Sequence, residues 1–157
     1  MSETINISGG KIVGARTSIF TIFNKEKYDP KAIPAAWQEF FAKSAGSDLG
    51  NAETFYGASI PSMSLDLPMD YFAGALVDVD EDVPTGMESV EIPQGSYLAV
   101  RHLGPISNIA ATYQKAYMEI LATSGKEMRP APHLEIYNPK LNPMAEDYEM
   151  IIGVPIN

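Results

Sequence analysis

Residues 70–77 read Asp70-Tyr-Phe-Ala-Gly-Ala-Leu-Val77, and a similar run, Asp147-Tyr-Glu-Met-Ile-Ile-Gly-Val154, follows 77 positions later. Two further pairs of segments match in the same order: 35–41 with 111–117, and 13–16 with 98–101. The members of the first of these pairs are 76 positions apart, and those of the second are 85 apart. The difference means that the first half carries about nine additional residues around positions 24–34. Three matches in one order indicate an internal duplication.

Each half has the pattern of a strand, a helix and two further strands. Apolar residues recur at helical spacing from Ile33 to Phe41 and from Ile106 to Leu121, and a glycine follows each run. The expected strands are 11–20, 55–60 and 71–79 in the first half and 97–102, 134–137 and 148–156 in the second. The sequence therefore predicts an α+β fold made of a duplicated βαββ module, with antiparallel sheets and two main helices.

The two halves are expected to form a single domain over residues 1–157. Half one is about 8–80 and half two about 86–157, with an acidic stretch at 78–86 between them. This stretch lacks the ligand spacing and the closing glutamate of a calcium loop, so it is interpreted as a solvated linker.

The composition excludes several classes of protein. The chain has 157 residues, no cysteine and a formal net charge of −9. Without cysteine it has no disulfide, thiolate zinc site or iron–sulfur cluster, and we expect no metal and no cofactor. The negative charge argues against direct nucleic-acid binding, which depends on clustered Lys and Arg. No apolar run reaches the length of a membrane span and no secretory signal is present, so we expect a cytoplasmic protein with no membrane partner.

Several segments resemble the GyrI-like domain, also known as the AraC-type effector-binding domain. The most specific are Leu134-Glu-Ile-Tyr-Asn-Pro139 and Ile152-Gly-Val-Pro155, supported by residues 33–41, 56–57, 69–74, 101–105 and 113–114. The similarity spans roughly residues 8–157. The resemblance implies two halves about a pseudo-two-fold axis, with a central groove for flat, often cationic, aromatic compounds. Family members occur in bacterial multidrug-responsive regulators, as free-standing proteins, as a gyrase inhibitor and as hydrolases of cyclopropane-bearing compounds. This chain resembles a free-standing member.

Glu135 is the main candidate for ligand binding. Strand alternation places it on one face with His133 and Tyr137, and we expect Leu134 and Ile136 on the other face, toward the helices. A carboxylate bordered by aromatic rings attracts a cation strongly, and each ring adds ~0.5–2 kcal/mol of cation–π attraction. The alternative is a solvated glutamate on an exposed strand. The resemblance favours the ligand-binding role, because the family carries its central acidic residue in this motif.

Aromatic side chains are the expected walls of the groove. A tyrosine offers both a flat apolar face and a hydroxyl group. Alignment of the two hairpins places Tyr56 opposite Glu135 across the axis. The candidate lining residues are Tyr56, Tyr71, Tyr97, Tyr137 and Trp37. For Trp37, a place in the core and a place in the groove wall are equally compatible with its helical stripe.

Four other residues are expected to lie outside the ligand site. Tyr113 and Tyr117 lie on the apolar stripe of the second helix, which is typical of core residues. His102 precedes a strand-to-helix turn and is expected to be structural. His133 would share a face with Glu135 if the strand began at that residue, but the preceding Pro132 favours a loop end.

The favoured function is non-covalent binding of a small cationic or aromatic organic compound. One alternative is a hydrolase of strained, cyclopropane-type electrophiles, in which Glu135 would activate water with Tyr56 or Tyr137 assisting. Another is a protein-interaction module, similar to a gyrase inhibitor, with an unidentified partner. The sequence favours binding over catalysis but leaves all three open.

Overall fold

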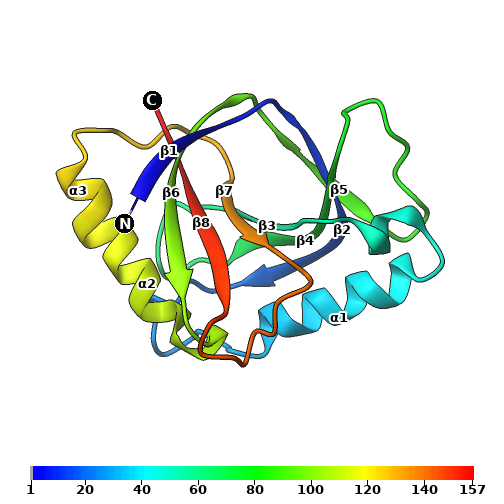
Figure 1. The fold of residues 1–157 in the computed structure, drawn as a ribbon, viewed down its shortest axis with the longest axis horizontal. Helices are drawn as coiled ribbons and strands as arrows, with labels where there is room; N and C mark the ends of the chain where they lie inside the picture. Colours follow the sequence, from blue (N-terminus) through cyan, green and yellow to red (C-terminus); the bar gives the residue numbers. More distant parts are fainter. Residues whose placement is uncertain (1) are drawn as a thin grey trace.

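The apolar runs of the two halves pair into one curled antiparallel sheet. We analysed a computed structural model, which describes residues 2–157 (Figure 1). The strands are β1 Ser2–Ile7, β2 Gly10–Ile19, β3 Phe55–Ile60, β4 Met69–Val77, β5 Glu88–Ile92, β6 Gly95–Leu103, β7 His133–Tyr137 and β8 Glu149–Ile156. Their order across the sheet is β1-β6-β8-β7-β3-β4-β2-β5. The α+β fold and the duplicated βαββ module are thereby confirmed.

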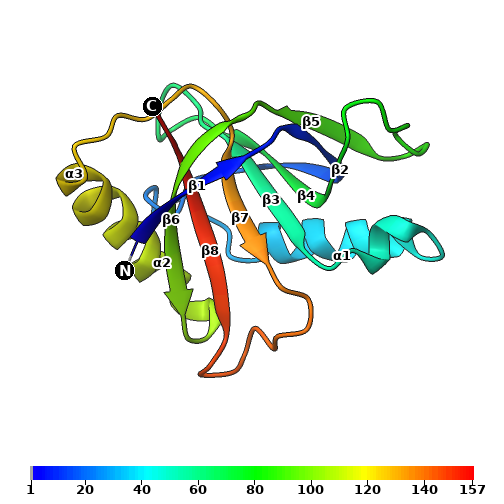
Figure 2. The same cartoon turned by 45° about the horizontal axis from the view of Figure 1, so that its top comes forward.

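The strand order reads as two equal halves that meet between β7 and β3. The first half supplies β2, β3 and β4, the second supplies β6, β7 and β8, and each set occupies the same relative places. Two edge strands were not predicted, β1 and β5, and they cross over between the halves (Figure 2). β1 lies at the start of the chain but pairs with β6 of the second half, whereas β5 lies at the start of the second half but pairs with β2 of the first. Each half thus completes the sheet of the other.

One helical segment follows the leading strand of each half. The first is α1, Ala32–Ser44, and it is followed by a short 3₁₀ turn, η1, at Asp48–Asn51. The second runs from the 3₁₀ turn η2 (Ile106–Asn108) through α2 (Ile109–Lys115) and a π-helical turn η3 (Ala116–Ile120) to α3 (Leu121–Thr123). π-helical turns are rare and occur frequently at functional sites.

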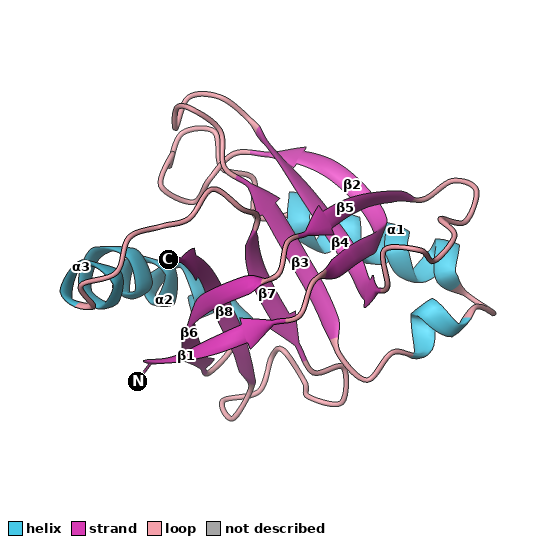
Figure 3. Cartoon of the chain, turned by 90° about the horizontal axis from the view of Figure 1, so that it is seen from above, coloured by secondary structure: helices cyan, strands magenta, loops and turns pink. Residues whose placement is uncertain are grey.

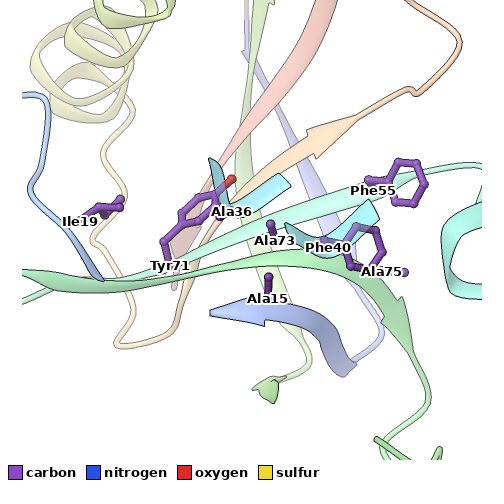
Figure 4. Packing of buried hydrophobic residues seen from close by; sticks show 8 residues of the cluster. All are labelled: Ala15, Ile19, Ala36, Phe40, Phe55, Tyr71, Ala73 and Ala75. Carbon is purple, nitrogen blue, oxygen red and sulfur yellow. The ribbon is translucent and has the colours of Figure 1, made fainter. Parts of the chain in front are cut away.

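Hydrophobic side chains form three buried clusters. One packs α1 against β2, β3 and β4, and Figure 4 shows its members: Ala15, Ile19, Ala36, Phe40, Phe55, Tyr71, Ala73 and Ala75. A second packs the helical segment of the second half against β6 and β8. The third cluster lies on the other face of the sheet and includes Leu134. Leu134 therefore faces away from the helices, which corrects the expected direction of alternation in β7.

None of the helices in residues 2–157 is both long enough and apolar enough to cross a bilayer.

Candidate functional site

A groove of about 670 Å³ lies on the helix-bearing face of the sheet and is lined by residues of β3, β7 and both helical segments. Figure 3 shows the two helical segments on either side of β3 and β7. Residues 19–23, the start of α1, the β3–β4 connection and one side of α2 form its walls. Its lining is mostly apolar, and the polar side chains on its sheet side include His133 and Glu135. A large apolar cavity with few convergent polar groups is typical of a small-molecule site.

Glu135 is buried at this groove and is held by three tyrosines. Only 5% of its surface is exposed. Its Oε1 accepts hydrogen bonds from the hydroxyls of Tyr71 (2.7 Å) and Tyr137 (2.6 Å), and its Oε2 accepts one from Tyr113. Behind them, Trp37 Nε1 donates to the Tyr71 hydroxyl at 3.0 Å. The carboxylate is thus fixed by residues from both halves of the chain.

The three tyrosines can serve only as donors to this carboxylate. Burial, and secondly the negative charge of Glu135, raise the pKa of Tyr71, Tyr113 and Tyr137 well above the ordinary value. The hydroxyls therefore remain protonated at physiological pH. The four ion pairs in residues 2–157 all lie on the surface, and none includes Glu135. Hydrogen bonds alone, with no protein cation, balance the carboxylate within the described chain.

Gly57 makes room for this network. It pairs with Glu135 across the central strands β3 and β7. A Cβ atom at Gly57 would lie 2.2 Å from the Tyr71 hydroxyl oxygen and 2.8 Å from Glu135 Oε1. Only glycine fits at this position without displacing those side chains.

His133 and Tyr117 form a second polar pair in the groove. Their rings stack at a centroid distance of 5.6 Å and an interplanar angle of 21°, and the Tyr117 hydroxyl is hydrogen-bonded to His133 Nδ1. Burial lowers the pKa of His133 to about 4, so its imidazole is neutral at pH 7. Tyr113 stacks on the far side of Tyr117, with ring centroids 6.3 Å apart and planes 9° from parallel. The groove thus has a continuous aromatic wall beside the carboxylate.

The structure brings together four of the predicted site residues. Glu135 and Tyr137 line the groove. Tyr71 is fully buried and, with Trp37, lies behind the carboxylate, where both side chains support it by hydrogen bonds. Trp37 also packs edge-on against Tyr137, with a centroid distance of 5.1 Å.

Tyr56 and Tyr97 lie elsewhere. Both pack in the cluster on the opposite face of the sheet, which corrects the expectation that they line the groove with Glu135. The reason is strand register: Gly57 is the residue paired with Glu135, and the adjacent Tyr56 therefore points to the other face. Tyr97 is completely buried there, with the Arg129 guanidinium 5.0 Å from its ring centroid.

Three groove residues were missed as functional candidates: Tyr113, Tyr117 and His133. Tyr113 and Tyr117 are four residues apart, so a helix presents their hydroxyls on one side, and this spacing was the available signal. β7 begins at His133 itself, so the residue shares the face of Glu135 despite Pro132. His102 is structural as expected, because it is buried with its ring nitrogens at Thr112 Oγ1 and the Pro105 carbonyl.

The geometry is suited to holding a positively charged, partly apolar molecule. Within residues 2–157, no three His, Asp or Glu side chains are grouped in a way that would hold a metal ion. A second cavity, of about 460 Å³, shares only Tyr137 with the groove and is lined by the surface ion pair of Arg101 and Glu149. It has no buried charge comparable to Glu135.

Comparison with known proteins identifies a family and a shared fold. Residues 21–156 match the family described as GyrI-like small molecule binding domain. The chain is 29% identical over 87 residues to the transcriptional regulator BrlR of Pseudomonas aeruginosa, a match that takes in 55% of this chain but only 32% of that regulator.

Solved structures of similar fold cover nearly the whole chain. SAV2435 bound to tetraphenylphosphonium superposes with a TM-score of 0.75 at 16% identity, covering 100% of this chain and 94% of SAV2435. EcmrR in a complex with DNA gives a TM-score of 0.67 at 16% identity, covering all of this chain but 57% of EcmrR. A hydrolase encoded by lin2189 from Listeria innocua gives 0.59 at 17% identity, covering 99% of this chain and 91% of that one.

Proposed function

The chain belongs to the GyrI-like small-molecule binding family, and on that premise we propose that its groove binds organic cations carrying aromatic groups. In this proposal, binding is non-covalent, Glu135 supplies the counter-charge, and the aromatic wall supplies the apolar contact.

One observation carries the proposal: a buried carboxylate with three hydroxyl donors, and with no cationic partner among residues 2–157, lies at an apolar groove. Withdrawing a carboxylate from water is costly unless hydrogen bonds and an opposite charge compensate. The tyrosines supply the hydrogen bonds, and a bound cation would supply the opposite charge. Because the carboxylate is partly shielded from water, its attraction for a cation is stronger than at an open surface.

The aromatic wall supports the same ligand class. Three tyrosines line the groove around the carboxylate: Tyr113, Tyr117 and Tyr137. Their rings therefore offer faces and edges to a bound molecule. Aromatic faces attract cations, and flat rings pack on them. Tetraphenylphosphonium, which is bound in the structure of SAV2435, is a cation of this class and is a suitable first probe for this chain.

Isothermal titration calorimetry with tetraphenylphosphonium tests the proposal. Glu135→Gln keeps the shape of the side chain but removes its charge, and we expect the affinity to fall about 10- to 100-fold. Glu119→Gln, at an exposed position of η3, is the matched control and should bind like the unmodified chain. Equal affinity of Glu135→Gln and the control would refute the role of Glu135.

We propose binding in preference to hydrolysis. Both oxygens of Glu135 already accept hydroxyl hydrogens, and Oε1 accepts two. These bonds occupy most of the lone pairs with which the carboxylate could take up a water molecule. Tyr56, one of the assisting residues suggested by the sequence, lies on the other face of the sheet.

We further propose that residues 1–157 act as one binding domain, with halves at about 8–80 and 86–157. Support comes from the continuous sheet and from Glu135, which is held by Tyr71 of one half and Tyr113 of the other. The net charge of −9 favours a small cation over nucleic acid as the partner. The chain spans about a third of BrlR, and the activity of that regulator as a whole belongs to a longer protein. The absence of cysteine agrees with a cytoplasmic location.

A further inference from the structure

His133 is the groove residue whose role the proposed function leaves unassigned. It lies two residues before Glu135 on β7, so both side chains project from the same face of the strand. Two residues of a strand span about 7 Å. The imidazole therefore stands beside the carboxylate along the groove, and both residues line the same cavity.

The hydrogen bond to Tyr117 determines which ring nitrogen of His133 carries the proton. The Tyr117 hydroxyl is hydrogen-bonded to His133 Nδ1, and this is the hydroxyl's one hydrogen bond among the described residues. A buried hydroxyl needs an acceptor for its hydrogen. Nδ1 is the acceptor at hand, and we therefore assign the proton of the neutral ring to Nε2.

The protonated nitrogen, Nε2, is available to a ligand. Among residues 2–157 this nitrogen has no hydrogen-bond partner. Every fully buried side-chain nitrogen or oxygen of the described chain does have a partner, so Nε2 is not fully buried. Nε2 is consequently accessible, on a residue that lines the groove. Burial lowers the pKa of His133 to about 4, so at pH 7 the ring donates a hydrogen bond without repelling a cation.

We propose that His133 is a second recognition point, whose Nε2–H donates a hydrogen bond to a neutral acceptor on the bound molecule. This inference rests on the proposed function and narrows its ligand class. The groove selects organic cations that carry a carbonyl or ether oxygen about 7 Å from the positive centre. Glu135 recognises the charge, and His133 recognises the acceptor.

Two matched probes separate these roles in calorimetry: (4-acetylphenyl)triphenylphosphonium and (4-isopropylphenyl)triphenylphosphonium. They have the same charge and similar shape, but only the acetyl compound carries an acceptor. We expect the unmodified chain to bind the acetyl compound about five- to tenfold more tightly, the value of one neutral hydrogen bond. In His133→Phe, which retains a ring to stack on Tyr117, the two probes should bind equally.

The outcomes distinguish this inference from the proposed function. If both probes bind the unmodified chain equally, or if His133→Phe keeps the preference, the second recognition point is refuted while cation binding stands. If neither probe binds, both proposals fail.

A measurement on the unmodified chain covers the case in which the variant does not fold. Nitrogen-15 NMR of the imidazole at pH 7 should show a protonated Nε2 and an unprotonated Nδ1 for His133. A protonated Nδ1 would overturn the inference.

Discussion

At the scale of single residues, Gly57 and Glu135 act as a pair. They face each other across the central strands, and the space that a side chain at Gly57 would fill is taken by the Tyr71 hydroxyl and the carboxylate. The position of the charge therefore depends on the absence of a side chain on the neighbouring strand.

We expect Gly57→Ala to break the Tyr71–Glu135 hydrogen bond. The added methyl group would lie 2.2 Å from the Tyr71 hydroxyl, and relieving this overlap should cost about 1–3 kcal/mol of unfolding free energy. Denaturant unfolding measures the loss, and calorimetry should show weaker binding of tetraphenylphosphonium. Gly153→Ala is the control, because its nearest contact would be 3.3 Å. Equal stability of the two variants would contradict the close packing.

His133 should make the free energy of unfolding depend on pH. Its pKa is about 4 in the folded chain and about 6.5 when unfolded, so the unfolded chain binds more protons between these values. Stability is full above pH 6.5 and falls as the pH decreases toward 4, by about 2 kcal/mol between pH 7 and pH 5. His133→Gln, which can still accept from Tyr117, should flatten this part of the profile. An unchanged slope in denaturant unfolding across these pH values would contradict the burial of His133.

At the scale of elements, the start of α1 positions part of the groove wall. Asp29 Oδ1 accepts a hydrogen bond from the Lys31 backbone N–H at 2.9 Å, in the turn that leads into α1 at Ala32. Pro30 and Ile33 line the groove. The segment that adds residues to the first half thus ends in a side-chain-stabilised turn beside the site.

Removal of this turn bond should destabilise the fold moderately. We expect Asp29→Ala to lower the unfolding free energy by about 1 kcal/mol, since the Lys31 backbone N–H loses its partner. Asp29→Asn retains an oxygen acceptor and should lose only a few tenths of that value. Thermal or denaturant unfolding of the three proteins would measure the difference. A loss in Asp29→Asn equal to that in Asp29→Ala would argue for a charge effect in place of the hydrogen bond in the turn.

The sequence was sufficient for the repeated elements but not for the edge strands or the face of β7. Helices and hairpins carry long apolar patterns that recur in both halves. β1 and β5 are short, half-polar edge strands, and their partners lie in the other half, so no local pattern marks them. Alternation groups His133 with Glu135 correctly but does not say which face meets the helices. Helices usually cover the apolar face of a strand. Here the polar face of β7 is on the helix side of the sheet, because it lines the groove between the two helical segments.

At the scale of the whole molecule, the crossing of β1 and β5 makes each half dependent on the other. A fragment containing residues 1–82 would hold β1 without its partner β6, and it would lack β5, the partner of β2. The remaining residues would have the converse defect. Unpaired edge strands and a divided core leave neither fragment with a complete sheet.

We therefore expect fragments 1–82 and 83–157 to be unfolded alone and to assemble when mixed. The cut lies in the exposed segment between β4 and β5, so it removes no buried contact. Circular dichroism and binding of tetraphenylphosphonium by the mixture measure the assembly. A chain cleaved at the same place after folding is the control and should keep its affinity. Cooperative unfolding of either fragment by itself would contradict this interdependence.

The centre of the sheet has a consequence for the bound molecule's orientation. Counted from either edge of the sheet, equivalent strands of the two halves follow one another in the same order. The backbone therefore offers an elongated guest two equivalent directions. The carboxylate is on β7 and a glycine takes the facing place on β3. The side chains therefore offer a charged guest only one of these two directions. A guest with a charged head and a neutral tail would consequently adopt one pose along the groove, in place of two poses related by the pseudo-two-fold axis, each at half occupancy.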